Sequence, residues 1–184
     1  MDMEAEVLES KVHIVTVSSS SIRNIERCLE QSELEVDKII LNPIAKSQAL
    51  LSQEEKNNGV CLVDIGAGVT SYSVFHEEGI IRSGVIAAGG DEVTQEIAYA
   101  FDTSFEEAKR LKESYGSALS SSLNEEKFID FVQSRNKDEH HLSSFELSEV
   151  IEGAYRDIFM LLKNELKHHN LDGIIKSGFV LCGG

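Results

Sequence analysis

An apolar strand that ends in a carboxylate and runs directly into a glycine turn is the feature that most limits how this chain folds. Residues 60–65 are almost continuously apolar, and Asp64 lies at the end of the run. Gly66-Ala67-Gly68 turns the chain, and residues 69–75 then alternate as a second strand does. A further turn leads into a third strand over residues 80–88. The pattern predicts three antiparallel strands joined by tight turns.

The turn has the composition of a phosphate-binding loop. Gly66 and Gly68 let the backbone approach a bulky anion, and the main-chain N–H groups around them form a concavity that suits phosphate oxygens. Asp64 is suited to hold Mg²⁺, directly or through water, because hard cations prefer oxygen ligands, and Thr70 could add a hydroxyl. A plain β-hairpin explains the same residues. The carboxylate favours the phosphate interpretation, because an apolar run rarely carries one without a partner or a role.

A small module of strand, helix and strand is predicted ahead of the turn. Residues 11–17 and 36–41 are short, apolar and β-branched, and residues 22–29 between them carry apolar side chains at helical spacing. Asn42-Pro43 then breaks the pattern. A short helix is expected over residues 43–52.

Helices dominate the rest of the chain. One helix is expected directly after the third strand, and a second over residues 104–115. Residues 117–143 are polar and serine-rich, and we expect a surface excursion there with a short strand at 127–132. A long amphipathic helix is expected over residues 144–169, followed by a last buried strand at 178–182. The expected buried face of the long helix consists of Leu147, Val150, Ile151, Ala154, Ile158, Leu161 and Leu162.

The start of the helix after the third strand offers a second position for an anion. Gly89 and Gly90 precede this helix, and a helix N-terminus carries partial positive charge and free N–H groups. Asp91 also has the character of an ordinary N-cap. A capped helix after a glycine turn therefore explains the sequence equally well.

The charge balance limits the ligands that the surface can attract. The chain carries 32 acidic and 17 basic residues, for a net charge of −15. This charge excludes a general phosphate-neutralising surface for nucleic acid and electrostatic binding to anionic lipid. An anionic ligand must instead be held locally, by backbone N–H groups, a metal or a few placed cations. The three cysteines are widely spaced and suggest neither a disulfide framework nor a metal site.

The segment from Asp64 to Thr70, with the sequence Asp-Ile-Gly-Ala-Gly-Val-Thr, resembles the second phosphate loop of the actin-like ATPase superfamily. Its surroundings resemble the FtsA branch of bacterial cell-division proteins. The resemblance runs in order over nearly the whole chain, apart from residues 117–143. The matching stretches are residues 12–16, 22–28, 59–64, 96–101 and 150–152.

The resemblance implies an α/β fold, namely a ribonuclease H-like, actin-type ATPase lobe with a mixed sheet. Residues 1–42 would be part of the small extra subdomain of the FtsA branch, and residues 43–184 would be the second lobe, truncated at the adenosine motif. It also implies ATP and Mg²⁺ as cofactors. Gly89 and Gly90 would lie against the nucleotide, Lys112 would reach the ribose and adenine, and Gly183-Gly184 would begin the adenosine-binding turn.

The function implied is that of a cytoplasmic ATP-binding adaptor, placed at the division site on the inner face of the cell membrane. Such a protein polymerises like actin, links the FtsZ ring to the membrane through a C-terminal amphipathic helix, and recruits later division proteins. We expect this chain to be a fragment without the first phosphate loop and the membrane helix. It should therefore bind ATP poorly, lack ATPase activity of its own and self-associate readily, with at most a weak ATPase in the full-length protein.

Two alternatives keep the same fold and change the function. A phosphoryl-transfer enzyme such as a sugar kinase needs a catalytic carboxylate that faces a substrate hydroxyl. The sequence offers only Asp64 for that role, and we assign Asp64 to the metal. A pilus-assembly adaptor is the other alternative, since the module over residues 11–41 is expected in both kinds of adaptor.

Overall fold

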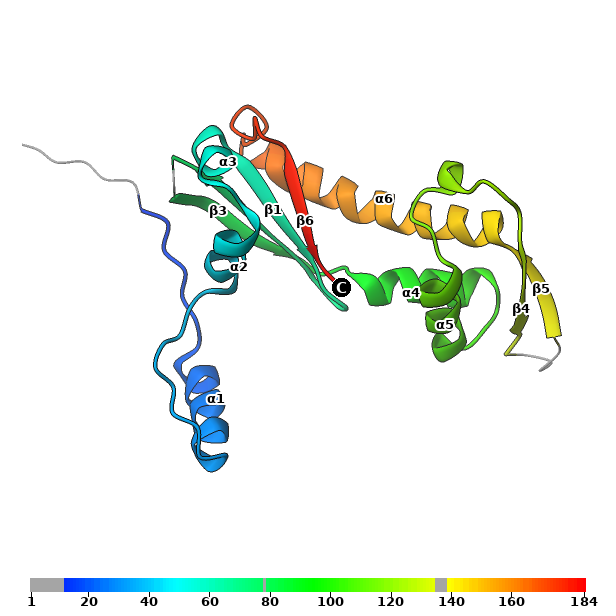
Figure 1. Cartoon of the computed structure of the whole chain (residues 1–184), viewed down its shortest axis with the longest axis horizontal. Helices are drawn as coiled ribbons and strands as arrows, with labels where there is room; N and C mark the ends of the chain where they lie inside the picture. The colour runs from blue at the N-terminus through cyan, green and yellow to red at the C-terminus, as the bar shows by residue number, and fades with distance from the viewer. Residues whose placement is uncertain (1–11, 78, 135–138) are drawn as a thin grey trace, which may run out of the picture.

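A four-stranded mixed sheet forms the centre of the molecule, as the computed structural model shows (Figure 1). The model describes residues 12–77, 79–134 and 139–184. The strands lie in the order β3-β2-β1-β6, with β1, β2 and β3 antiparallel and β6 parallel to β1. The predicted three-stranded meander is thereby confirmed. The strand bounds are Val60–Ile65 for β1, Thr70–His76 for β2, Gly79–Ile86 for β3 and Phe179–Gly183 for β6.

Helices cover the sheet, and a separate two-stranded hairpin lies at the far end of the molecule from α1 (Figure 1). Within the described ranges no helix is long and apolar enough to cross a membrane. The helix bounds are Ser19–Gln31 for α1, Asn42–Leu50 for α2, Gln53–Asn58 for α3, Gly90–Ala100 for α4, Phe105–Tyr115 for α5 and Ser144–His168 for α6. The hairpin pairs β4, Phe128–Val132, with β5, Glu139–Ser143, and a short 3₁₀ turn covers Ser120–Ser122.

Alternation along β1 divides the core into two parts. Cys61 and Val63 point into the large cluster that α4, α5 and α6 cover, whereas Val60 and Leu62 point to the opposite face. That second face has a smaller cluster, which includes Leu51 after α2. Because side chains alternate in a strand, Asp64 lies on the same face as Leu62 and not on the face of the main core.

The long helix α6 confirms the predicted amphipathic segment. A capping box at Ser143 and Glu146 starts it, and an apolar stripe faces the core. The expected burial of Leu161 is wrong, because its side chain is 48% exposed. Buried positions in this half of α6 recur every four residues, from Ile158 to Leu162 and Leu166. A four-residue step exceeds the helical turn of 3.6 residues, so the buried stripe moves around the helix and leaves Leu161 outside it.

The strands expected on either side of α1 are absent from the described residues, although α1 itself is confirmed. Residues 12–17 and 36–41 form no strand. Ile14 is 75% exposed and Ile39 60% exposed. Apolar, β-branched sequence favours a strand, but a strand also needs a hydrogen-bonded neighbour. Neither segment has one among the residues that the structure describes.

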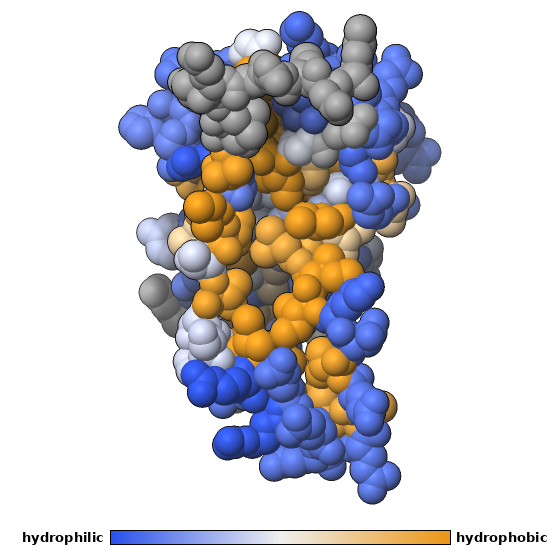
Figure 2. Space-filling model, turned by 90° about the vertical axis from the view of Figure 1, so that its left-hand side faces the viewer, coloured by the Kyte–Doolittle hydropathy of each residue, from blue (hydrophilic) through white to orange (hydrophobic). Residues whose placement is uncertain are grey.

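An apolar groove of about 780 Å³ lies between these segments and the sheet. Figure 2 shows it as a band of apolar side chains on the face that carries α1, with polar residues on both sides. Val17, Ile25 and Ile40 line it from the N-terminal part of the chain, and Phe75 and Ile80 line it from the sheet. The apolar residues of the N-terminal module thus face a common hollow instead of a sheet of their own.

Strand β6 was expected to be buried, and this expectation is wrong. Phe179 and Leu181 are each 55% exposed. The reason lies in the topology, because β6 pairs with β1 on one side and is the edge of the described sheet on the other. An apolar run cannot distinguish a central strand from an edge strand.

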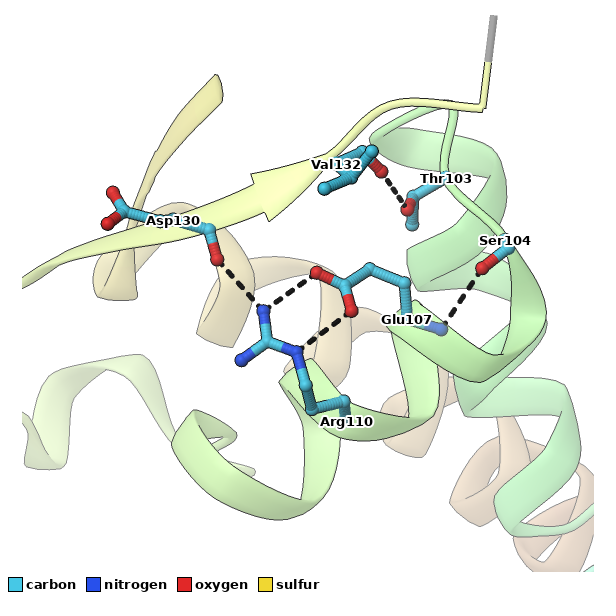
Figure 3. A network of polar contacts seen from close by, with 6 residues as sticks. All are labelled: Thr103, Ser104, Glu107, Arg110, Asp130 and Val132. Carbon is cyan, nitrogen blue, oxygen red and sulfur yellow. Dashed lines mark hydrogen bonds and ion pairs between the residues drawn. The ribbon is translucent and has the colours of Figure 1, made fainter. Parts of the chain in front are cut away.

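Polar contacts hold the β4–β5 hairpin against α5 (Figure 3). Thr103 Oγ1 donates to the carbonyl of Val132 at 2.6 Å. Arg110 donates twice to the Glu107 carboxylate, at 2.7 and 2.8 Å, and once to the carbonyl of Asp130 at 2.8 Å. Strand β4 confirms the short strand expected in the polar excursion. Arg110 of α5 satisfies a backbone carbonyl of this strand.

We expect Thr103→Val to destabilise the protein by about 1–3 kcal/mol, because it keeps the side-chain shape and leaves the Val132 carbonyl without its donor. Urea unfolding followed by circular dichroism measures the change. Thr16→Val, at an exposed position, is the matched control. Equal stability of the two variants would show that this bond does not hold the hairpin.

Candidate phosphate-binding site

The glycine turn after β1 carries three consecutive backbone donors without an acceptor among the described residues. The amide of Gly66 donates to the carbonyl of Val69 at 2.9 Å and closes the turn. Ala67, Gly68 and Val69 are exposed. Within the described part of the chain, no hydrogen bond is made by the amides of these three residues. Adjacent free N–H groups on an exposed turn are suited to an anion, as the sequence predicts.

The N-terminus of α4 packs directly on this turn. The amide of Gly90 donates to the carbonyl of Gly66 at 2.9 Å, and the amide of Asp91 donates to the carbonyl of Ala67 at 2.7 Å. The first amides of α4 therefore fix the turn and are not left for a ligand. Gly89 is the N-cap, and Asp91 lies in the first helical turn instead of capping it.

Gly89 is required by this packing. A Cβ at Gly89 would lie 2.5 Å from the carbonyl oxygen of Gly66 and 2.6 Å from that of Ala67. Real Cβ atoms do not approach backbone oxygens so closely, so a side chain here would push α4 away from the turn. Gly68, by contrast, has open space where a Cβ would stand.

The glycine pair at the end of β6 reaches the same edge of the sheet. Because β6 runs parallel to β1, its last residues lie beside the start of the turn. The amide of Gly184 donates to the carbonyl of Ile65 at 3.1 Å. Gly183 has a φ of +110°, and a Cβ there would overlap the backbone of Ile65. Only glycine fits this conformation and this contact.

Lys112 of α5 brings a cation to the same place. Its Nζ donates to the carbonyl of Gly90 and to Thr94 Oγ1, each at 2.6 Å. Burial lowers the pKa of Lys112, and the charge of Asp91 opposes this effect. The predicted residues of the turn, α4, α5 and the end of β6 are thus close neighbours in the structure.

Thr70 is placed differently from the other predicted residues. It is the first residue of β2 and is fully buried, and its Oγ1 is enclosed with no hydrogen-bond partner in the part of the chain that the structure describes. The hydroxyl therefore does not lie on the exposed surface of the turn.

Asp64 has partners that the sequence did not indicate. Lys46 Nζ lies 2.6 Å from Asp64 Oδ2, and Asn42 Nδ2 donates to the same oxygen at 3.4 Å. Both partners belong to α2, which precedes β1. The Cys182 thiol lies beside the carboxylate, and burial together with the charge of Asp64 raises the pKa of Cys182. The spacing of residues 42 and 46 places them on one helix face, but it does not indicate that Asp64 lies opposite this face.

The fit of Mg²⁺ to Asp64 is limited by this arrangement. A metal ion bound directly to Oδ2 would have to displace Lys46 Nζ. Beside the ion pair is a space of only about 10 Å³, whereas Mg²⁺ usually keeps several of its waters. No group of three or more metal-binding side chains occurs in the described ranges. The residues present fit an anion on the turn and do not fit a metal bound directly to Oδ2, so a contact through water stays a prediction.

We expect Gly89→Ala to lower the free energy of unfolding by about 1–3 kcal/mol, because the added Cβ overlaps the carbonyls of Gly66 and Ala67. Gly68→Ala should change it by less than about 1 kcal/mol, since the site is open and its φ is not positive. Urea denaturation of both variants tests the pair. An unchanged Gly89→Ala protein would contradict the tight packing of α4 on the turn.

The larger part of the chain matches a family of known proteins. A family model described as Cell division protein FtsA matches residues 61–178. FtsA of Pseudomonas aeruginosa is 38% identical over 177 residues, which cover 96% of this chain and 42% of the relative. FtsA of Bacillus subtilis is 32% identical over 177 residues, with 96% of this chain and 40% of the relative covered. The chain spans about two fifths of the length of these relatives.

Solved structures share the fold at low sequence identity. MreB5 of Spiroplasma citri bound to ADP is 21% identical with a TM-score of 0.73, and the match covers 91% of this chain and 54% of that one. A PilM–PilN type IV pilus biogenesis complex matches at 18% identity with a TM-score of 0.62, over 89% of this chain and 40% of that one. These likenesses show the expected actin-like α/β fold. The sequence matches go further, and the chain belongs to the FtsA family of cell division proteins.

Proposed function

We propose that this chain forms one wall of an ATP-binding cleft in an actin-like protein of bacterial cell division. The observation that carries the proposal is the row of free amides at Ala67, Gly68 and Val69. It lies where the start of α4 and the end of β6 meet the turn. The ADP complex of Spiroplasma citri MreB5, a protein of the same fold, supports a nucleotide as the anion.

The residues of the site would divide the work between phosphate and adenosine. The amides of Ala67, Gly68 and Val69 would hold phosphate oxygens, as backbone donors do in other anion sites. Gly183 and Gly184 would allow close approach on the adenosine side. Mg²⁺ would arrive on the phosphate oxygens and neutralise part of their charge, with Asp64 contacting it through water.

The wider role proposed for the protein is that of an adaptor. The family supports partners among division proteins and filament formation through an actin-like fold. From these we infer FtsZ as a partner, self-association into filaments, and a location at the division site on the inner face of the membrane. A solved MamK double helical filament has the same fold, at 16% identity and a TM-score of 0.62. Recruitment of later division proteins and membrane attachment through an amphipathic helix complete the proposed role.

A pilus adaptor is the second candidate, supported by the likeness to the PilM–PilN complex. The family match favours cell division over it. A phosphoryl-transfer enzyme is less well supported, because the Asp64 carboxylate is already paired with Lys46. Lys46 Nζ occupies the Oδ2 atom that a substrate hydroxyl would otherwise contact.

Adding ATP and Mg²⁺ should shift the amide NMR signals of Ala67, Gly68 and Val69 in the isotope-labelled chain, because these donors are free. Gly68→Pro removes one N–H and should weaken binding about tenfold, the effect of losing a hydrogen bond to a charged group. Gly68→Ala keeps the N–H and is the control. Equal affinities of the two variants, or shifts centred elsewhere, would overturn the proposed site.

Pull-down of purified FtsZ and of purified PilN by the immobilised chain separates the two adaptor roles. We expect retention of FtsZ alone, because the sequence match is to division proteins. The Thr103→Val variant tests whether the β4–β5 hairpin contributes to FtsZ binding, and Thr16→Val is its control. Retention of PilN without FtsZ would reject the division role and leave the nucleotide site intact.

A further inference from the structure

We propose that Lys46 is the internal counter-ion of Asp64 and prevents divalent metal ions from binding this carboxylate directly. The inference deepens the proposed ATP site and rests on that function for its biological meaning. The ion pair itself is a feature of the described residues. Lys46 would then be a positioning residue, which acts on a ligand through Asp64.

The geometry of α2 places two donors on one carboxylate oxygen. Asn42 and Lys46 are four residues apart, so their side chains leave the helix on the same face. Lys46 Nζ lies 2.6 Å from Asp64 Oδ2 and Asn42 Nδ2 lies 3.4 Å from it. Ser47, next to Lys46, is 2% exposed, and its hydroxyl donates to the carbonyl of Ile44. The helix is therefore packed in a position that holds Lys46 at the carboxylate.

The charges around Asp64 make the pair neutral. Lys46 Nζ lies 2.6 Å from Asp64 Oδ2, which is the distance of a charge-assisted hydrogen bond between an ammonium and a carboxylate. One carboxylate and one ammonium therefore balance at the end of β1. A metal ion would meet no net negative charge there.

The available space also disfavours a metal. The hollow beside the pair has about 10 Å³ and is bounded by Pro43, Leu62 and Ser73, among others. That is room for about one water molecule at most. A divalent ion with its waters does not fit this hollow, and direct binding to Oδ2 would require it to displace Lys46.

The pair also has a consequence for an anion on the turn. A bare carboxylate two residues before Gly66 would repel a phosphate group bound at the neighbouring amides. Neutralisation by Lys46 removes most of that repulsion without a metal ion. The free amides and the neutral pair thus favour the same ligand.

The test measures Mn²⁺ binding to the whole chain without nucleotide, from paramagnetic broadening of the amide signals of residues 65–69. Lys46→Met should bind Mn²⁺ at least about tenfold more tightly than the unchanged protein, because the competing ammonium is gone. Lys46→Gln is the second uncharged variant, and circular dichroism checks that each variant folds. Adding Asp64→Asn to Lys46→Met should abolish the gain.

Two controls keep the charge argument specific. Lys46→Arg retains the cation and should bind Mn²⁺ as weakly as the unchanged protein. Lys167→Met removes one positive charge from an exposed position in the last turn of α6 and should have no effect. Equal Mn²⁺ affinity with and without the Lys46 charge, whether tight or undetectable, would overturn the inference. Because nucleotide is absent, such a result leaves the Gly68→Pro test of the ATP site independent.

Discussion

The packing of the α4 N-terminus on the glycine turn is the contact on which the rest of the site depends. Two amides of α4 bind two carbonyls of the turn, and this fixes the turn without using the amides of Ala67, Gly68 and Val69. A turn held through its carbonyls leaves these three amides without a partner among the described residues. Such a preorganised set of donors can bind an anion without further ordering of the backbone. Gly89 makes the contact possible because any side chain there would separate the two elements.

The alternation of β1 has an equally direct effect on Asp64. Its neighbours Val63 and Ile65 belong to the main core, so the carboxylate lies on the opposite face, towards α2. The turn that follows and the carboxylate that precedes it therefore have different surroundings. The turn carries the free backbone amides, whereas the Lys46 ammonium and the Asn42 side-chain amide contact the Asp64 carboxylate. This separation would allow an acidic chain to hold the proposed anion beside one of its own carboxylates.

Local features of the sequence predicted most of the elements correctly. Glycine turns and alternation identified the meander, and apolar side chains at helical spacing identified the long helix α6. Errors came where the outcome depends on a neighbour. Residues 36–41 have the composition of a strand but no partner among the described residues, and β6 has a partner on one side only.

The sequence by itself determined the turn, its glycines and the carboxylate before it, because these depend on residues adjacent in the chain. It also showed the family, through matches that follow one another in order. Only the tertiary structure decided which amides of the turn stay free, that Gly184 lies beside Ile65, and that Lys46 neutralises Asp64. Contacts of this kind join residues that are 18 to more than 100 positions apart, and their formation depends on how helices and strands pack, which no local pattern specifies.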